Sequence, residues 1–217
     1  MLYIVSTPIG NLKDITLRAI DTLREVDVIL AEDTRRTKIL LNEYLVRDKR
    51  ILSYNEINKT RRTQEAIELL KQGKDIALVS DSGTPGISDP GFFLVREAIK
   101  YNIQISPIPG ACAFISALVC SGLPTDKFEF YGFIPKKQGQ KKKFIQSIGE
   151  KTAIFYESPH RIQKTLKLMA EAIPERNVVL ARELTKKFEE FIRGTAKGVY
   201  SNLKDREIKG EIVVIVH

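Results

Sequence analysis

The sequence is poor in the residues that bind zinc and form disulfides. Its 217 residues include only two cysteines and two histidines, and these do not make up a zinc-binding motif. Cys112 and Cys120 lie eight residues apart in a stretch of helical character. A helix would hold their backbones about 12 Å apart, too far for a disulfide. We therefore expect no metal site, two reduced cysteines in the core, and a protein of the reducing cytoplasm.

Long apolar runs and the common nucleotide-binding motifs are also missing. No apolar run has the length of a membrane span, so we expect no membrane contact. A strand pattern begins at residue 2 with no basic leader before it, so no secretory signal is expected. The chain has no G-x-G-x-x-G after its first strand and no Walker A motif, which argues against a Rossmann dinucleotide site and a P-loop.

What remains is the composition of a basic globular protein. Hydrophobic residues make up 43% of the chain and charged residues 29%, as in folded soluble domains. The length suffices for one large domain or two small ones. The net charge of +8 favours an anionic partner, and leaves nucleic acids, acidic small molecules and anionic surfaces open.

Apolar runs alternate with helical patterns through the first half of the chain. Strands are predicted at residues 2–5, 26–31, 51–54, 76–80 and 103–108. This alternation predicts an α/β fold with a mostly parallel sheet. Turns follow three of the strands, at Pro8-Ile9-Gly10, Gly83-Thr84-Pro85 and Pro109-Gly110. In a parallel sheet these turns lie at one edge, where ligands bind.

A change in composition near residue 122 divides the chain. Residues 122–126 have the composition of a linker, so we place an N-terminal α/β lobe at 1–121 and a C-terminal α/β lobe at 122–217. Strands in the second lobe are predicted at 128–134, 152–156, 178–182, 189–194 and 211–217. Some of them follow one another without a helix, which indicates a mixed sheet. We expect a cleft between the two lobes.

Residues 80–91 form a loop that is rich in glycine and proline. Three glycines and two prolines in these twelve residues let a ligand approach the backbone and hold that backbone in shape. Asp81 and Asp89 add two acceptors. The alternative is an ordinary strand-to-helix turn in which Asp89 or Ser88 caps the next helix.

Charged clusters follow other predicted strands. Residues 32–37 are either a capped helix start or, through Arg35 and Arg36, an anion contact. Lysines at 136, 137, 141, 142 and 143 form either a solvated loop or a contact with a phosphate backbone. Few aromatics are interleaved with these lysines, which argues against a stacking platform for single strands.

Two further clusters lie in the second lobe. Residues 156–161 are either a helix start, capped by Ser158 with Pro159 in the first turn, or a site in which His160 is a general base. Residues 182–186 are equally a surface turn or a cleft wall.

Eight ordered motifs carry a family resemblance. They are Ser6-Thr7-Pro8-Ile9-Gly10-Asn11-Leu12, Ala31-Glu32-Asp33-Thr34-Arg35, Ser80-Asp81-Ser82-Gly83-Thr84-Pro85 with Ile87-Ser88-Asp89-Pro90-Gly91, Pro109-Gly110, Ser121-Gly122-Leu123-Pro124-Thr125-Asp126, Tyr156-Glu157-Ser158-Pro159-His160-Arg161, Ala181-Arg182-Glu183-Leu184-Thr185-Lys186 and Arg193-Gly194-Thr195. With them the chain resembles, over nearly its whole length, the ribosomal RNA small subunit methyltransferase I family. That family is a branch of the tetrapyrrole methylase superfamily, the class III S-adenosylmethionine-dependent methyltransferases.

The resemblance implies a two-lobed α/β fold, a homodimer and S-adenosylmethionine held between the lobes. It implies 2′-O-methylation of a cytidine ribose in the decoding region of 16S rRNA, and it leaves open whether the substrate is free rRNA or the assembled small ribosomal subunit. The residues that it assigns to the methyl donor are Pro8, Ser82, Gly83, Thr84, Ile87, Cys112, Ala113, Tyr156, Glu157 and Leu184. The residues expected to contact the RNA are Arg35, Arg36, His160, Arg161 and Lys186.

The acceptor of the 2′-hydroxyl proton is not fixed by the resemblance. Asp81 and Asp89 are the first candidates, and Glu32, Asp33, Glu157, His160 and Lys186 are the others. The chain departs from the family in Ser82, where many relatives have Ala, and in Cys112, where they commonly have Ser. Longer members also carry a further C-terminal segment, which bears on the RNA-binding surface.

Two other functions remain open from the residues. A tetrapyrrole methyltransferase would also take an anionic substrate, although motifs at 7–10 and 156–160 follow the rRNA branch. A non-enzymatic RNA-binding assembly factor would bind RNA but not the methyl donor.

Overall fold

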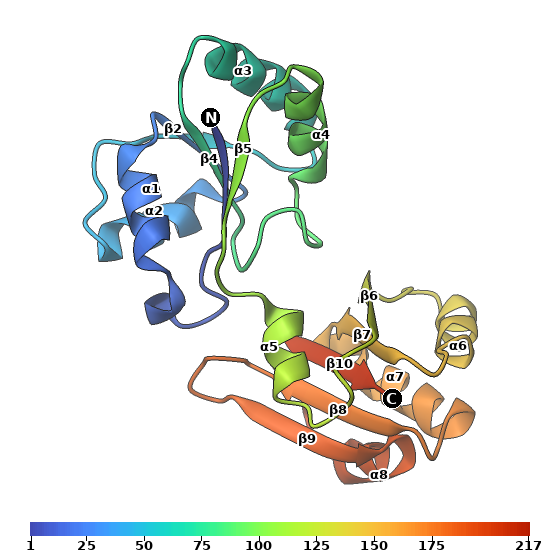
Figure 1. Cartoon of the computed structure of the whole chain (residues 1–217). Coiled ribbons are helices and arrows are strands. Elements are labelled where there is room, and N and C mark those ends of the chain that lie inside the picture. Colours follow the sequence, from blue (N-terminus) through green and yellow to red (C-terminus); the bar gives the residue numbers. More distant parts are fainter. The chain divides into compact units, whose positions relative to one another are not determined.

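The computed structural model describes residues 1–217 and divides into two compact units, Met1–Cys112 and Ala113–His217 (Figure 1). The sequence placed a boundary after residue 121. The units divide earlier because helix α5 (Ala113–Val119) packs on strands of the second unit. The chain enters that unit through this helix, and the linker-like residues 122–126 follow it.

The first unit is built on a fully parallel five-stranded sheet. Its strands are β1 (Leu2–Val5), β2 (Val28–Ala31), β3 (Arg50–Ser53), β4 (Ile76–Val79) and β5 (Ile105–Ile108), in the order β3-β2-β4-β1-β5. Every residue of β2 and β4 is buried, which is why these strands are continuous apolar runs. The predicted parallel sheet is confirmed.

Helices cover both faces of this sheet (Figure 1). On one face, α1 (Leu17–Glu25) and α2 (Thr34–Glu43) pack on residues such as Val5 and Val79. On the other, α3 (Lys59–Lys71) and α4 (Phe92–Lys100) pack on residues such as Leu30 and Leu78. The chain moves outward through α1 and α2 and returns through α3 and α4, and crossovers of one hand place these pairs on opposite faces.

The second unit is built on a mixed five-stranded sheet. Its strands are β6 (Phe128–Phe133), β7 (Thr152–Glu157), β8 (Asn177–Arg182), β9 (Glu190–Thr195) and β10 (Ile212–Val216), in the order β6-β7-β10-β8-β9. Only β6 and β7 pair in parallel. The predicted mixed sheet is therefore confirmed.

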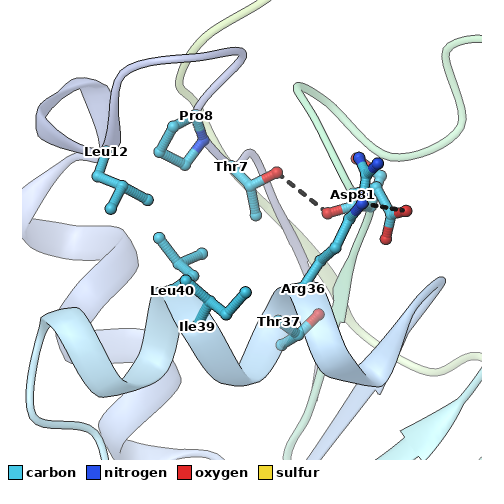
Figure 2. A pocket seen from close by; sticks show the side chains of 9 residues that line it. Thr7, Pro8, Leu12, Arg36, Thr37, Ile39, Leu40 and Asp81 are labelled. Atoms are coloured by element: carbon cyan, nitrogen blue, oxygen red, sulfur yellow. Dashed lines mark hydrogen bonds and ion pairs between the residues drawn. The ribbon is translucent and has the colours of Figure 1, made fainter.

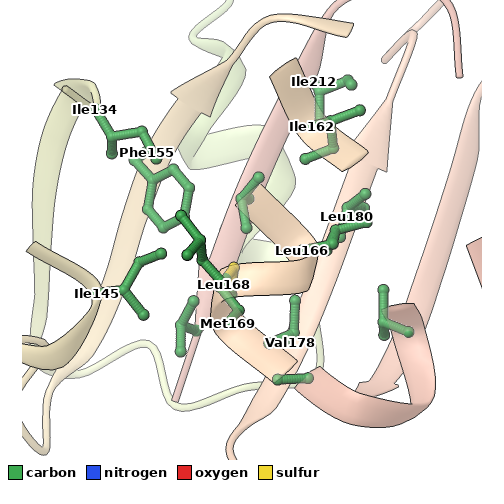
Figure 3. Close-up of a cluster of buried hydrophobic side chains, with 14 of the residues drawn as sticks. Ile134, Ile145, Phe155, Ile162, Leu166, Leu168, Met169, Val178, Leu180 and Ile212 are labelled. Atoms are coloured by element: carbon green, nitrogen blue, oxygen red, sulfur yellow. The ribbon is translucent and has the colours of Figure 1, made fainter. Parts of the chain in front are cut away.

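One face of the second sheet carries the larger core. Helices α6 (Gln138–Gln146), α7 (Pro159–Ala172) and α8 (Ala196–Leu203) supply Ile145, Leu166 and Val199 to it. Figure 3 shows Phe155 of the sheet packed among these helical side chains. Because side chains alternate along a strand, Tyr156 faces the opposite side, where Phe114 of α5 stacks on Phe130.

The starts of three helices test the predicted caps. Helix α2 begins at Thr34, where Asp33 caps it by accepting from the Arg35 amide, in agreement with the capped helix start considered for residues 32–37. Ser158 caps α7 and Pro159 opens it, as predicted. Helix α4 follows Gly91 without a side-chain cap, so the alternative in which Asp89 or Ser88 caps this helix is wrong.

The prediction of two core cysteines is also wrong. Cys120 is exposed and Cys112 is half-buried, because both lie at the ends of the short α5 rather than inside a longer helix. None of the helices combines the length and the apolar character that a membrane span requires.

Candidate active site

The loops after β1 and β4 are joined by hydrogen bonds at the sheet edge where the strands end. The Thr7 amide donates to the Gly83 carbonyl at 2.9 Å, and the Gly83 amide donates to the Thr7 carbonyl at 3.1 Å. The buried Thr7 hydroxyl donates to the Ser80 carbonyl at 3.1 Å. Since an unpaired buried polar group costs free energy, each loop fixes the conformation of the other.

A chain of hydroxyl groups adds the loop after β5. Ser6 Oγ and Thr84 Oγ1 lie 2.9 Å apart, and the Thr84 hydroxyl donates to the Ala111 carbonyl at 3.2 Å. A hydroxyl has one proton to donate, so Ser6 is the donor to Thr84. The predicted meeting of the three turns at one sheet edge is confirmed within the first unit.

Two glycines allow these loops to come this close. A Cβ at Gly110 would lie 2.9 Å from the Ser6 Cβ, a distance that real side chains avoid. Gly83 has φ +84° and a Cβ there would touch Ile9 Cγ2 at 3.4 Å. The joined loops therefore present backbone groups at their closest approach.

The joined loops carry most of the residues that the sequence assigns to the methyl donor in this unit. These are Pro8, Ser82, Gly83, Thr84 and Cys112. Pro8 and Gly83 are buried, and the other three are half-buried. Ile87 lies farther out on the central loop and is 38% exposed.

Four acids gather beside the loops, at the ends of β2 and β4. Asp81 Oδ1 accepts from the Asp33 amide at 2.9 Å, and Glu32 Oε2 accepts from the Asp81 amide at 3.3 Å. Burial, helped by the negative charge of Asp81, raises the pKa of Glu32. Burial, followed by the charge of Glu32, raises the pKa of Asp89 to about 7. At neutral pH Asp89 can therefore take up a proton.

The two adjacent arginines differ in their partners. The Arg35 guanidinium contacts both carboxylate oxygens of Asp33 and holds the pKa of that carboxyl at about 2. Arg36 Nε lies 3.6 Å from Asp81 Oδ2, and its side chain is 64% exposed. Arg36 therefore keeps most of its donors for a ligand.

A pocket of about 180 Å³ lies between the first loop and α2 (Figure 2). The residues that line it are Thr7, Pro8, Leu12, Arg36, Thr37, Ile39, Leu40, Ser80 and Asp81. The sequence assigned roles to Pro8, Arg36 and Asp81 but none to Leu12, Ile39 or Leu40. The residue that could have indicated this pocket is Ile39, a large apolar side chain of α2 that the structure leaves 63% exposed.

In the second unit, Glu157 is the centre of a buried network. Its side chain is fully buried and accepts from Lys141 Nζ at 2.7 Å and from the Thr165 hydroxyl at 2.6 Å. Arg161 Nη2 pairs with its other oxygen at 2.7 Å, and the Ser158 amide donates to that oxygen at 2.8 Å. The carboxylate of Glu157 is thus engaged inside its own unit.

Residues 136–143 are not one solvated basic loop, because Lys141 is buried. Its side chain is only 4% exposed, because it lies in α6 on the same face as the buried Ile145. The remaining lysines, 136, 137, 142 and 143, are exposed.

The other expected site residues of the second unit have varied surroundings. Tyr156 contacts the rings of Phe130 and Phe133, and Leu184 is buried. His160 is exposed. Lys186 pairs with Glu183 at 3.0 Å and with Glu211 at 2.8 Å. Arg161 Nε and Nη1 are shielded from solvent and have no hydrogen-bond partner in the chain.

Aromatic side chains lie beside the exposed lysines, which the sequence did not lead us to expect. Tyr131 and Phe133 of the edge strand β6 are 40% and 62% exposed. The Tyr131 ring meets Phe144 of α6 edge-on at 4.9 Å, and this contact ties the strand to the helix. We call Tyr131, Phe133, Lys136, Lys137, Lys142 and Lys143 the basic–aromatic surface.

Solved structures share this fold at low sequence identity. Diphthine synthase matches with a TM-score of 0.73 and 16% identity, over 99% of this chain and 89% of that one. Uroporphyrin-III C-methyltransferase from Thermus thermophilus, solved in complex with S-adenosylhomocysteine, matches with a TM-score of 0.63 and 14% identity, over 99% and 96%. These likenesses show the fold.

Comparison of sequences finds relatives of much higher identity. The family Tetrapyrrole (Corrin/Porphyrin) Methylases matches residues 1–199. Ribosomal RNA small subunit methyltransferase I of Halalkalibacterium halodurans is 49% identical, over 99% of this chain and 75% of the relative. The protein of that name from Thermotoga maritima is 46% identical, over 99% and 97%. The chain therefore belongs to the tetrapyrrole methylases and, within them, to the ribosomal RNA small subunit methyltransferase I family.

Proposed function

We propose that this protein transfers a methyl group from S-adenosylmethionine to the 2′-oxygen of a cytidine ribose in the decoding region of 16S rRNA. Family membership makes it a methyltransferase and supports S-adenosylmethionine as donor and rRNA as substrate. The observation that carries the proposal is the joining of three loops at the sheet edge, through Thr7–Gly83 and Ser6–Thr84–Ala111.

The residues at this edge fit a cationic donor. The loops approach most closely through their backbones, because a side chain at Gly110 would clash with Ser6. Asp81, whose amide donates to the Glu32 carboxylate, stands at the start of the central loop that takes part in this contact. Carboxylates stabilise a nearby positive charge such as that of a sulfonium. We assign the donor contacts to Pro8, Ser82, Gly83, Thr84, Ile87 and Cys112 in the first unit and to Ala113, Tyr156, Glu157 and Leu184 in the second. Glu157 would contribute through its backbone, since its carboxylate is already paired.

When bound, S-adenosylmethionine supplies an activated methyl group, so the chain has to align the ribose and take up one proton. We propose Asp89 as the acceptor of the 2′-hydroxyl proton, because its pKa of about 7 suits proton uptake at neutral pH. Asp81 is the second candidate. Its carboxylate already accepts from the Asp33 amide and faces Arg36.

The RNA would meet both arginines of α2 and the second unit. We assign phosphate contacts to Arg35 and Arg36, and to His160, Arg161 and Lys186. The basic–aromatic surface extends this set, because lysines neutralise phosphates and exposed rings such as Phe133 stack on unpaired bases. Phe133 also touches Tyr156, which joins this surface to a proposed donor contact.

The family resemblance further leads us to propose a homodimer that acts in the cytoplasm, where small ribosomal subunits are. Light scattering of the purified protein at micromolar concentration measures the mass in solution. A mass of twice the 24.6 kDa chain is expected, and a monomer would contradict this part of the proposal.

Mapping of ribose methylation on 16S rRNA tests the central proposal. A strain that lacks the protein should lose one 2′-O-methylcytidine in the decoding region, and the wild-type gene should restore it. A gene carrying Asp89→Asn should restore it poorly. A methylation pattern that does not change in the deletion strain would rule the proposal out.

The tetrapyrrole alternative predicts a different substrate. The relatives at 46–49% identity are named as rRNA methyltransferases, whereas the solved uroporphyrin-III C-methyltransferase is only 14% identical. Methyl transfer from labelled S-adenosylmethionine to small ribosomal subunits, compared with transfer to a corrinoid precursor, separates the two. We expect label on the subunits alone.

A further inference from the structure

We propose that the pocket between the first loop and α2 receives the base of the target nucleotide and selects cytosine. This inference rests on the proposed function and adds to it the residues that recognise the substrate. It assigns Arg36 to the base, leaving the phosphate contact on α2 to Arg35, and it combines Arg36 with Asp81 and with apolar walls made by Pro8, Leu12, Ile39 and Leu40. Pro8 would lie between the base and the donor.

The shape of the pocket suits a flat ring. Figure 2 shows Pro8 and Leu12 on the loop side and Ile39 and Leu40 on the helix side, facing one another across the opening. Its volume of about 180 Å³ leaves room for one pyrimidine. Ile39 is 63% exposed, an unfavourable position for a large apolar side chain that a stacked base would cover.

The polar end of the pocket matches one edge of cytosine. Asp81 offers a carboxylate acceptor, and Arg36 offers guanidinium donors beside it, with Arg36 Nε 3.6 Å from Asp81 Oδ2. Cytosine presents an amino donor next to two acceptors, and acidic side chains accept from that amino group. Uracil would instead turn a carbonyl oxygen toward the carboxylate, which has no proton to donate.

The pocket lies next to the proposed site of reaction. Thr7 and Ser80 belong both to its lining and to the hydrogen bonds that join the loops. A nucleotide with its base in the pocket would therefore hold its ribose beside those loops. Enzymes that act on a nucleotide commonly take it out of the base stack into such a pocket.

Asp81→Asn tests the selection. Small ribosomal subunits that carry either C or U at the methylated position are the substrates, and the single-turnover rate of methyl transfer is measured for each. The wild-type protein should prefer C by about tenfold or more. In Asp81→Asn, which keeps an acceptor for the Asp33 amide, the preference should fall to about threefold or less. Glu43→Gln, an exposed charge change on α2 outside the pocket, should keep the wild-type preference.

Ile39→Trp tests the pocket by filling it. The side chain is already exposed, so the variant should keep the wild-type melting temperature while its methylation rate falls at least about tenfold, the loss of roughly one good base contact. Asn42→Trp, on an exposed position of α2 that does not line the pocket, is the matched control and should stay active.

Calorimetry with S-adenosylhomocysteine separates base recognition from donor binding. Both pocket variants should bind it with the wild-type dissociation constant, because S-adenosylhomocysteine lacks the sulfonium charge that the Asp81 carboxylate would stabilise. Weaker binding in either variant would assign the pocket to the donor and overturn the inference. An unchanged preference for C in Asp81→Asn, with active Ile39→Trp, would also overturn it while leaving the proposed function standing. A wild-type protein that methylates no ribose of the subunits would remove the proposed function itself.

Discussion

At the scale of single residues, Asp89 has acidic neighbours although the protein as a whole is basic. The chain carries a net charge of +8, yet Asp89 lies near Glu32 and Asp81, and burial and these charges raise its pKa to about 7. If it accepts the proton, the rate of the chemical step should rise with pH through about 7 and level off above it. Single-turnover rates from pH 5.5 to 9 measure this profile, and Asp89→Asn should be slow and lack the step.

The same pKa bears on stability. A carboxyl with a pKa of about 7 when folded and about 3.9 when unfolded binds more protons in the folded state between these values. Its contribution to stability is therefore complete below the unfolded pKa and is lost as the pH rises through 7. Asp89→Asn should raise the melting temperature more at pH 8 than at pH 4.5. An equal effect at both pH values would contradict the raised pKa.

Lys141 and Glu157 are the second residue-scale case. Their side chains are 4% and 0% exposed and lie 2.7 Å apart. In Lys141→Met the Glu157 carboxylate keeps its ion pair with Arg161 but loses a buried partner on its other oxygen. The variant should therefore lower the free energy of unfolding by about 1–3 kcal/mol. Lys142→Met, at an exposed position of the same helix, should change it by less than about 0.5 kcal/mol. Urea unfolding followed by circular dichroism compares the two variants.

At the scale of elements, the loop after β5 depends on the absence of a side chain. A Cβ at Gly110 would lie 2.9 Å from the Ser6 Cβ, and Ser6 is the first donor of the chain that runs through Thr84 to Ala111. Gly110→Ala should therefore push two loops apart and weaken S-adenosylhomocysteine binding about tenfold or more, as misplaced contacts do. Gly139→Ala, where a Cβ has open space, is the control. Equal affinity in calorimetry would argue against the joined loops as the donor site.

The elements were predictable where burial is continuous or periodic. Residues 76–79 and 212–216 are wholly buried, and their apolar runs marked them as strands. The start of α2 was anticipated as a capped helix start within residues 32–37, because an acid there precedes the helix and can accept from its first amides, as Asp33 does. The insertion of β4 between β1 and β2 depends on long-range pairing, which no local pattern contains.

The candidate site was predictable where several turns share one sheet edge. Pro8, Gly83 and Gly110 were identified because glycine and proline after strands mark loops that face ligands. The pocket wall formed by Leu12, Ile39 and Leu40 was not, because each of them resembles an ordinary packing residue in its own segment. The burial of Lys141 was hidden by its four lysine neighbours, although its spacing from Ile145 places both on one helix face.

At the scale of the whole molecule, the positive charge predicts RNA binding that weakens with salt. Each lysine that contacts a phosphate of single-stranded RNA contributes about 0.7 to the slope of log K against log salt concentration. The double variant Lys142→Gln/Lys143→Gln should therefore reduce the slope by about 1.4. Lys197→Gln/Lys204→Gln, an equal charge change at exposed positions of and next to α8, should leave it unchanged. Filter binding of a 16S rRNA fragment at several salt concentrations gives both slopes.

Because the Lys141 ammonium is buried, its reaction with an external reagent can be used to follow unfolding of the second unit. An amine-acylating reagent reaches the nitrogens of Lys142 and Lys143 at once, whereas that of Lys141 is enclosed by Glu157 and Thr165. Mass spectrometry of the peptides from α6 should therefore find acyl groups on 142 and 143 within the first time points. Acylation at 141 then measures the fraction of molecules that have unfolded around it, with no substitution in the protein.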